Sequence, residues 1–184
     1  MSPPRLRPLS DAPAGAVEAL LDRVFGTDRH GRTAYAVRAG AAPLAELCFG
    51  AWDADEALVG TIQAWPVALA TDAGDSLPLV MVGPVAIAPP LQGLGIGRAL
   101  MAALGEAAER STDPGAAALM LIGDPEYYGR FGFTDAATAG WRVPGPVERH
   151  RLLARGAGVP ALAGLLGPRG EVAERRLPSL PALP

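Results

Sequence analysis

The chain of 184 residues is 49% apolar, which is enough for one domain with a hydrophobic core. Charged residues make up 19% and the formal net charge is -3, so a disordered chain is excluded and a nucleic-acid-binding protein, which would carry a basic excess, is not expected. The single cysteine, Cys48, rules out an internal disulfide, and no apolar run is long enough to span a bilayer. We therefore expect a cytoplasmic protein that binds neither nucleic acid nor membrane.

The first part of the chain predicts a short strand over 5–9 and two helices. The first helix is expected from Asp11 to Gly26, because Asp can cap free amides and the proline two residues later suits a first helical turn. A second, weaker helix is expected over 31–38.

The middle of the chain predicts a hairpin followed by a buried strand. Apolar stretches over 44–52 and 58–69 are joined by the polar turn 53–56, so they are expected to pair with each other. After a second turn at 72–76, the Val- and Ile-rich stretch 79–88 is expected to be a strand, which the two prolines after it end.

A helix, a strand and a short helix are expected next. Helical spacing relates the apolar residues Leu100, Met101, Leu104, Ala107 and Ala108. Pro114 breaks that helix, and 116–122 is an apolar strand. Asp124 and the proline after it open a short helix that ends near Gly132. One crossover joins the strands 79–88 and 116–122, as in mixed α/β folds.

The last third of the chain has weaker signals. We read 147–154 as a strand, 159–166 as a turn of helix and 171–177 as an edge strand. Residues 178–184 hold three prolines and are expected to form a flexible tail. The chain is therefore predicted to be one α/β (α+β) domain over 1–177, with the tail over 178–184.

The glycine-rich turn between the strand 79–88 and the following helix is the motif that carries chemistry. It places several backbone N–H groups at a helix N-terminus, where the amides and the helix dipole bind anions, above all phosphate. A nucleotide P-loop needs lysine, which this chain lacks, and a dinucleotide fingerprint needs glycine where Arg98 stands. The spacing that fits is Gln-x-x-Gly-x-Gly, from Gln92 through Gly95 to Gly97.

This turn resembles the pyrophosphate loop of the GCN5-related N-acetyltransferase (GNAT) superfamily. The strand 85–89 before it and the segment 123–133, Gly-Asp-Pro-Glu-Tyr-Tyr-Gly-Arg-Phe-Gly-Phe, also resemble elements of the superfamily. The second segment is similar to a variant found in one bacterial subgroup of predicted N-acetyltransferases. The resemblance is specific over 79–133 and implies a mixed central sheet with flanking helices, splayed between the fourth and fifth strands.

The resemblance implies that an acetyl group passes from acetyl-CoA to a primary amine by direct attack, through a tetrahedral intermediate. Catalytic roles would fall to Val85, whose region offers an N–H to the acetyl carbonyl, and to Tyr128, which would donate a proton to the departing thiolate. A tyrosine has an ordinary pKa near 10 and is therefore protonated at neutral pH. The cofactor-binding residues would be Val85, Ala86, Ile87, Gln92, Gly93, Leu94, Gly95, Ile96, Gly97, Arg98 and Tyr127.

The general base and the acceptor stay open. The strand segment 80–83 has no ionisable side chain, so the candidates are Glu46, Asp124, Glu126 or a chain of waters. A non-catalytic acyl-CoA-binding or sensing module is therefore the alternative, whereas a nucleotide-binding domain is disfavoured by the glycine spacing. The acceptor would be a small-molecule or peptide amine, and edge strands near the C-terminus are compatible with a homodimer.

The remaining reactive side chains have simpler interpretations. Cys48 is expected to be a buried, inert thiol, and the two histidines are too far apart in sequence to predict a metal site. Trp65 is a candidate for the edge of the acceptor pocket. The arginines of 149–155 are interpreted as a solvated strand face or as partners of the acidic end of the coenzyme.

Overall fold

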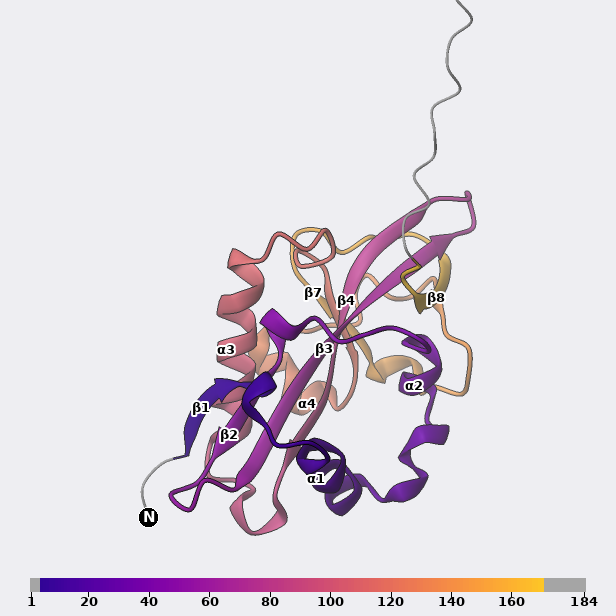
Figure 1. Ribbon diagram of the computed structural model, residues 1–184. Helices are drawn as coiled ribbons and strands as arrows, with labels where there is room; N and C mark the ends of the chain where they lie inside the picture. The colour runs from indigo at the N-terminus through magenta and orange to yellow at the C-terminus, as the bar shows by residue number, and fades with distance from the viewer. Residues whose placement is uncertain (1–3, 171–184) are drawn as a thin grey trace, which may run out of the picture.

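A mixed β-sheet runs through the protein, with helices on both of its faces in the computed structural model (Figure 1), which describes residues 4–170. The strands follow the order β1-β2-β3-β4-β5-β7, and β8 pairs with β3 and β6. Their bounds are β1 Arg5–Pro8, β2 Phe49–Trp52, β3 Leu58–Thr71, β4 Ser76–Ile87, β5 Leu119–Ile122, β6 Trp141–Arg142, β7 Leu152–Arg155 and β8 Gly164–Pro168. The expected mixed sheet with flanking helices is confirmed.

Four α-helices accompany the sheet in the described part of the chain: α1 Ala16–Phe25, α2 Thr33–Val37, α3 Ile96–Arg110 and α4 Pro125–Tyr128. Helix α1 contacts β3 and β4, and α3 contacts β2, β3 and β4. The prediction that α1 begins at Asp11 is wrong, because Asp11 ends a 3-10 helix and Gly15 is the N-cap of α1. Leu9 is buried and donates its N–H to the carbonyl of Cys48, which ties this segment to the sheet before the helix starts.

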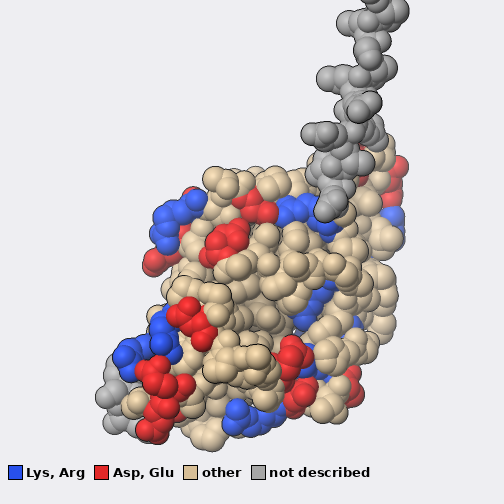
Figure 2. Space-filling model, viewed as in Figure 1, with Lys and Arg blue, Asp and Glu red and all other residues tan. Residues whose placement is uncertain are grey.

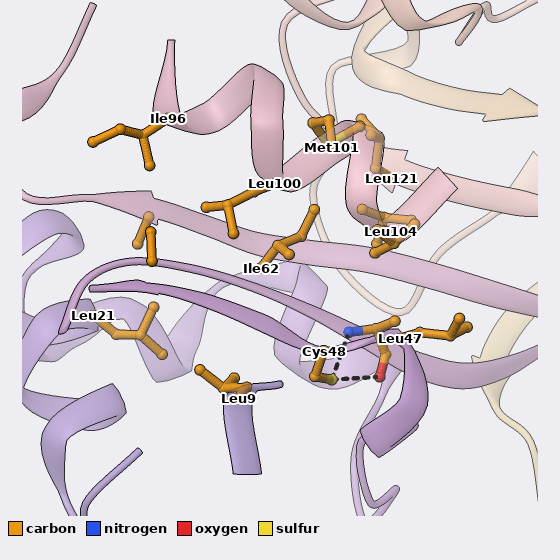
Figure 3. Packing of buried hydrophobic residues seen from close by; sticks show 14 of the residues in the cluster. Leu9, Leu21, Leu47, Cys48, Ile62, Ile96, Leu100, Met101, Leu104 and Leu121 are labelled. Carbon is orange, nitrogen blue, oxygen red and sulfur yellow. Dashed lines mark hydrogen bonds between the residues drawn. The ribbon is translucent and has the colours of Figure 1, made fainter. Parts of the chain in front are cut away.

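Helix α3 carries the apolar stripe that the sequence predicts. Leu100, Met101 and Leu104 are buried, and Figure 3 shows them on one side of the strands, near Ile62 of β3. Leu9, Leu21 and Cys48 lie on the other side in the same view. Burial of these side chains removes apolar surface from water and holds α1, through Leu21, and α3 against the sheet.

The C-terminal part of the fold differs from the sequence prediction. Residues 164–168 form β8, which pairs antiparallel with residues 67–71 of β3, so the helical turn predicted over 159–166 is wrong. Strand β7 begins at Leu152 rather than at Val147, because residues 149–151 form a 3-10 helix. The predicted strand 171–177 and tail 178–184 lie outside the described residues.

Strands β3 and β4 form a long hairpin that projects from the body of the protein (Figure 1). Strand β4 is also parallel to β5, but only Val80–Leu119 and Met81–Met120 are paired. Beyond these pairs β4 continues to Ile87, while β5 continues along β7 up to the pair Ile122–Leu152. The sheet therefore splays between its fourth and fifth strands, as predicted.

Candidate active site

A cavity of about 1300 Å³ lies where β4 and β5 separate. Its walls come from the segments 25–38, 81–85, 121–128 and 146–151, which are far apart in the sequence. Val85, Gln92, Tyr127 and Tyr128 all line it, so the splay gathers four of the predicted site residues around one space.

The edge of β4 that faces this space offers free backbone groups. Ala88 donates its N–H to the Val59 carbonyl of β3, and neighbouring residues of an antiparallel strand point their backbone groups to opposite sides. Val85 and Ile87 therefore point theirs away from β3, toward the gap. The side-chain amide of Gln92 donates to the Ile87 carbonyl at 3.1 Å, which agrees with this orientation. Ala86 is fully buried with its backbone toward β3, and it does not line the cavity.

The glycine-rich turn lies directly before α3 and leaves its first amides free. Gly93 and Gly95 have φ angles of 81° and 85°, in the left-handed region that favours glycine, and a Cβ at either would meet open space. No side chain caps the helix, so the N–H groups of Ile96, Gly97 and Arg98 have no partner within it. Positive φ angles, free amides and an open surface together fit a phosphate group.

The side chains of this turn contribute less than its backbone. Leu94 and Arg98 are exposed, and Arg98 forms no ion pair with any residue of 4–170. Ile96 is buried in the hydrophobic core and can offer only its backbone. The side chain of Tyr127 packs against Gly97, which connects the turn to α4.

Tyr128 is half-buried at the end of α4 and lines the cavity. Asp124 holds the start of this helix, because its carboxylate accepts the N–H of Glu126 at 2.9 Å. The phenol of Tyr128 forms no hydrogen bond within residues 4–170 and is not among their fully buried unpaired atoms, so it reaches the cavity. Burial, together with the nearby Tyr127, raises the pKa of Tyr128 to about 12, which keeps it protonated at neutral pH.

The candidates for a general base differ in whether they line the cavity. Asp124 lines the cavity, whereas Glu46, in a 3-10 helix before β2, and Glu126 do not. Glu148 also lines the cavity, and the sequence analysis missed it. Its carboxylate lies 3.5 Å from the side chain of His150.

One wall of the cavity, formed by α2 and the segment before it, was missed entirely. Arg29, Tyr35 and Arg38 lie there. The guanidinium of Arg29 is buried and donates to Glu18, Asp22 and Tyr35. Although burial alone would lower it, these hydrogen bonds raise the pKa of Arg29, which therefore stays charged and paired. The spacing Tyr35-x-x-Arg38 puts both side chains on one helix face. It was the only feature of the sequence that could have indicated this wall of the cavity.

Arg38 is 6% exposed and lies between two aromatic rings. Its guanidinium carbon is 4.3 Å from the ring centre of Tyr35 and 4.0 Å from that of Trp65. The carbonyl of Gly83, at the irregular part of β4, accepts from Arg38 at 3.2 Å and from the Trp65 indole at 2.8 Å. Trp65 thus supports the wall of the pocket through Arg38, without lining the cavity itself.

The three arginines of 149–155 do not share one solvated face. Arg149 donates to the carbonyls of Thr138, Ala139 and Trp141, and Arg155 donates to that of Phe131. Arg151 alone lines the cavity. Residues 4–170 contain no cluster of side chains that could hold a metal ion, and no helix among them is long and apolar enough to cross a membrane.

Comparison with known proteins gives a consistent result. The family model described as an acetyltransferase (GNAT) domain matches residues 5–136. The GNAT family N-acetyltransferase YhbS of Escherichia coli, solved in complex with CoA, has a TM-score of 0.70 and 24% identity, over 92% of this chain and 91% of that one. A GNAT family acetyltransferase of Brucella melitensis, in complex with acetyl-CoA, has a TM-score of 0.51 and 25% identity, over 84% and 97%. None of the curated proteins matches the sequence.

Proposed function

Because the chain belongs to the acetyltransferase (GNAT) domain family, we propose that it transfers the acetyl group of acetyl-CoA to a primary amine. The observation that carries this proposal is the free edge of β4, which shares one cavity with Tyr128 and leads to the glycine-rich turn. The Brucella melitensis relative, solved with acetyl-CoA, supports the choice of cofactor. The motif over 123–133 supports membership of the bacterial subgroup that it resembles.

In this proposal, the backbone of the protein holds acetyl-CoA, which supplies an activated acetyl thioester. The amides of 93–98 bind the pyrophosphate at the N-terminus of α3, where the helix dipole favours negative charge. The backbone groups of Val85 and the N–H of Ile87, whose carbonyl already accepts from Gln92, bind the pantetheine arm as an added strand would be bound. Tyr127, which packs on the turn and lines the cavity, contacts the same arm.

Two groups then act on the reacting atoms. The N–H of Val85 donates to the acetyl carbonyl and stabilises the negative charge that develops on its oxygen when the amine attacks. The protonated Tyr128 donates its proton to the departing thiolate. Its raised pKa suits this role, because the phenol keeps its proton at the moderately alkaline pH where a primary amine becomes a free base.

The proton of the attacking amine has two routes in this site. Asp124 and Glu148 both line the cavity, and either carboxylate can accept that proton directly or through water. Since β4 itself offers no ionisable side chain between Val80 and Gly83, a non-catalytic acyl-CoA-binding or sensing module is the second candidate function.

Thermal unfolding with and without acetyl-CoA tests the cofactor, with ATP and NAD as controls. A ligand that binds only the folded state raises the unfolding midpoint. We expect a rise with acetyl-CoA and none with the two controls. If acetyl-CoA leaves the midpoint of the folded protein unchanged, the proposal fails at its first step.

A further inference from the structure

We propose that the acceptor is an amino-acid-type molecule, whose carboxylate pairs with Arg38 while its amine attacks the acetyl group. This inference rests on the proposed function and names the substrate class of the same site. Arg29 and Arg38 are both buried in the cavity wall, but they differ in their partners.

Arg29 is neutralised inside the protein, whereas Arg38 is not. Arg29 forms ion pairs with Glu18 and Asp22. Within residues 4–170 no carboxylate forms an ion pair with Arg38, and burial lowers the pKa of this guanidinium. An arginine keeps its proton in proteins, so a full positive charge lies on a residue that is only 6% exposed and has no ion-pair partner within residues 4–170. Burying such a charge is costly unless a partner compensates it.

The contacts of Arg38 leave one part of its guanidinium available. The rings of Tyr35 and Trp65 lie against it, and Nη1 donates to the Gly83 carbonyl. Apart from an interaction of the guanidinium with the Tyr35 side chain, Nε and Nη2 have no hydrogen-bond partner within residues 4–170, yet neither is among the fully buried unpaired atoms of these residues. Because Arg38 lines the cavity, these two nitrogens are reached from it. Their parallel N–H groups match one planar carboxylate, the geometry of a bidentate pair.

The position of Arg38 relative to Val85 sets the size of the acceptor. Gly83, to which Arg38 is hydrogen-bonded, precedes Val85 by two residues of β4, a stretch of chain that spans at most about 7 Å. The carboxylate at Arg38 and the amine at the acetyl group are therefore only a few bonds apart. Such a spacing fits an amino acid and does not fit a polyamine, which has no anion for this site.

A panel of matched probes tests the inference. The twenty protein amino acids, each as the free acid and as the carboxamide, are offered with acetyl-CoA, and thiol release gives kcat/KM. Loss of the carboxylate lowers the pKa of the amine, so a larger fraction of the carboxamide is the reactive free base at neutral pH, and chemistry alone favours the amide. We expect the wild type to prefer the acid at least tenfold.

Variants of Arg38 assign that preference to its charge. In Arg38→Gln, kcat/KM for the acid should fall by roughly 30-fold or more, as when one partner of a buried charge pair is removed, and that for the amide should change little. Arg38→Lys should keep part of the preference. Arg110→Gln, which removes an exposed charge at the end of α3, is the matched control and should behave as wild type. Equal use of acids and amides by the wild type, or equal losses in Arg38→Gln, would overturn the inference.

A binding measurement separates this inference from the proposed function. If no amine is acetylated, the unfolding midpoint is measured with CoA plus N-acetylglycine or N-acetylglycinamide. A rise with the acid only, lost in Arg38→Gln, upholds the carboxylate site even though transfer has failed. The same midpoint with both compounds overturns it. An unchanged response of Arg38→Gln to acetyl-CoA shows that the variant is folded and that its cofactor site is intact.

Discussion

The hydroxyl oxygen of Tyr127 lies so close to Gly97 that a Cβ added at this glycine would stand 2.7 Å from it. The two residues join the first turn of α3 to α4, and thereby the proposed pyrophosphate site to the helix that carries Tyr128. Gly97 does not have a positive φ angle, so contact rather than backbone conformation demands glycine here.

The first prediction concerns this contact. Gly97→Ala should weaken acetyl-CoA binding about tenfold, because Tyr127 must move and overpacking costs about 1–3 kcal/mol. Tyr127→Phe removes the oxygen that the new Cβ would meet, so the double variant should bind nearly as well as Tyr127→Phe alone. Titration calorimetry gives the four affinities. Gly105→Ala, in the same helix, is the control, since its Cβ would meet only the end of the Arg155 side chain, at 3.1 Å. If the loss of acetyl-CoA binding free energy in the double variant equals the sum of the losses in the two single variants, the contact between Tyr127 and Gly97 is refuted.

The second prediction concerns Tyr128. Tyr128→Phe should lower kcat by about 100-fold or more, the range of a lost general acid, because the departing thiolate receives no proton. The affinity for acetyl-CoA should stay within a few-fold of wild type, since the backbone provides most of the proposed contacts. Steady-state kinetics and calorimetry check the two quantities. A kcat equal to that of wild type would leave Tyr128 as a packing residue only.

The third prediction follows from the raised pKa of Tyr128, about 12 in the folded protein against about 10 unfolded. The unfolded chain loses this proton first, so the contribution to stability is complete below pH 10 and is lost between pH 10 and pH 12. The free energy of unfolding should therefore decrease more steeply over this window in wild type than in Tyr128→Phe. Urea unfolding at pH 9.5 and 11.5 provides the comparison. Parallel decreases in both proteins would mean that the phenol is not buried as described.

The fourth prediction concerns Cys48, which lies in the core beside Leu9 and Leu47 (Figure 3). The thiol is 4% exposed, and burial raises its pKa to about 11. At pH 8 it should react with a thiol reagent only as fast as the protein opens, and at once in denaturant. The absorbance of the group that the thiol reagent releases gives the labelling rate in the native protein and in denaturant. Rapid, complete labelling of the native protein would contradict this burial.

The surface charge agrees with a small-molecule acceptor. Figure 2 shows acidic and basic residues interspersed over the face in view, with no extended basic area of the kind that binds nucleic acid. Exposed salt bridges, such as Arg5–Glu56 and Arg142–Asp72, contribute little to stability. We therefore assign specificity to the buried charge of Arg38 on the cavity wall as a proposal, rather than to the surface charges.

The parts of the site that the sequence predicted depend on local signals. The glycines before α3 need positive φ angles, and Asp124 caps α4 through an N–H two residues away. Both effects act within a few residues, so a sequence pattern can reveal them. The same holds for the apolar stripe of α3, whose period is that of a helix.

The errors have non-local causes. The Ala- and Leu-rich stretch 159–166 suits a helix, but pairing with β3, almost a hundred residues earlier, makes the end of it a strand. Arg38 was missed for a similar reason. Only tertiary packing brings it between Tyr35 and Trp65 and onto the Gly83 carbonyl, and the spacing Tyr35-x-x-Arg38 by itself does not predict that arrangement.

Turnover by the wild-type protein tests the central claim most directly. The protein is incubated with acetyl-CoA and a broad amine panel, while thiol release and the acetylated product are followed together by absorbance and mass spectrometry. The proposed function predicts that at least one primary amine is acetylated and that one thiol is released for each product molecule. Tight binding of acetyl-CoA with no transfer to any amine would contradict it and identify an acyl-CoA-binding module instead.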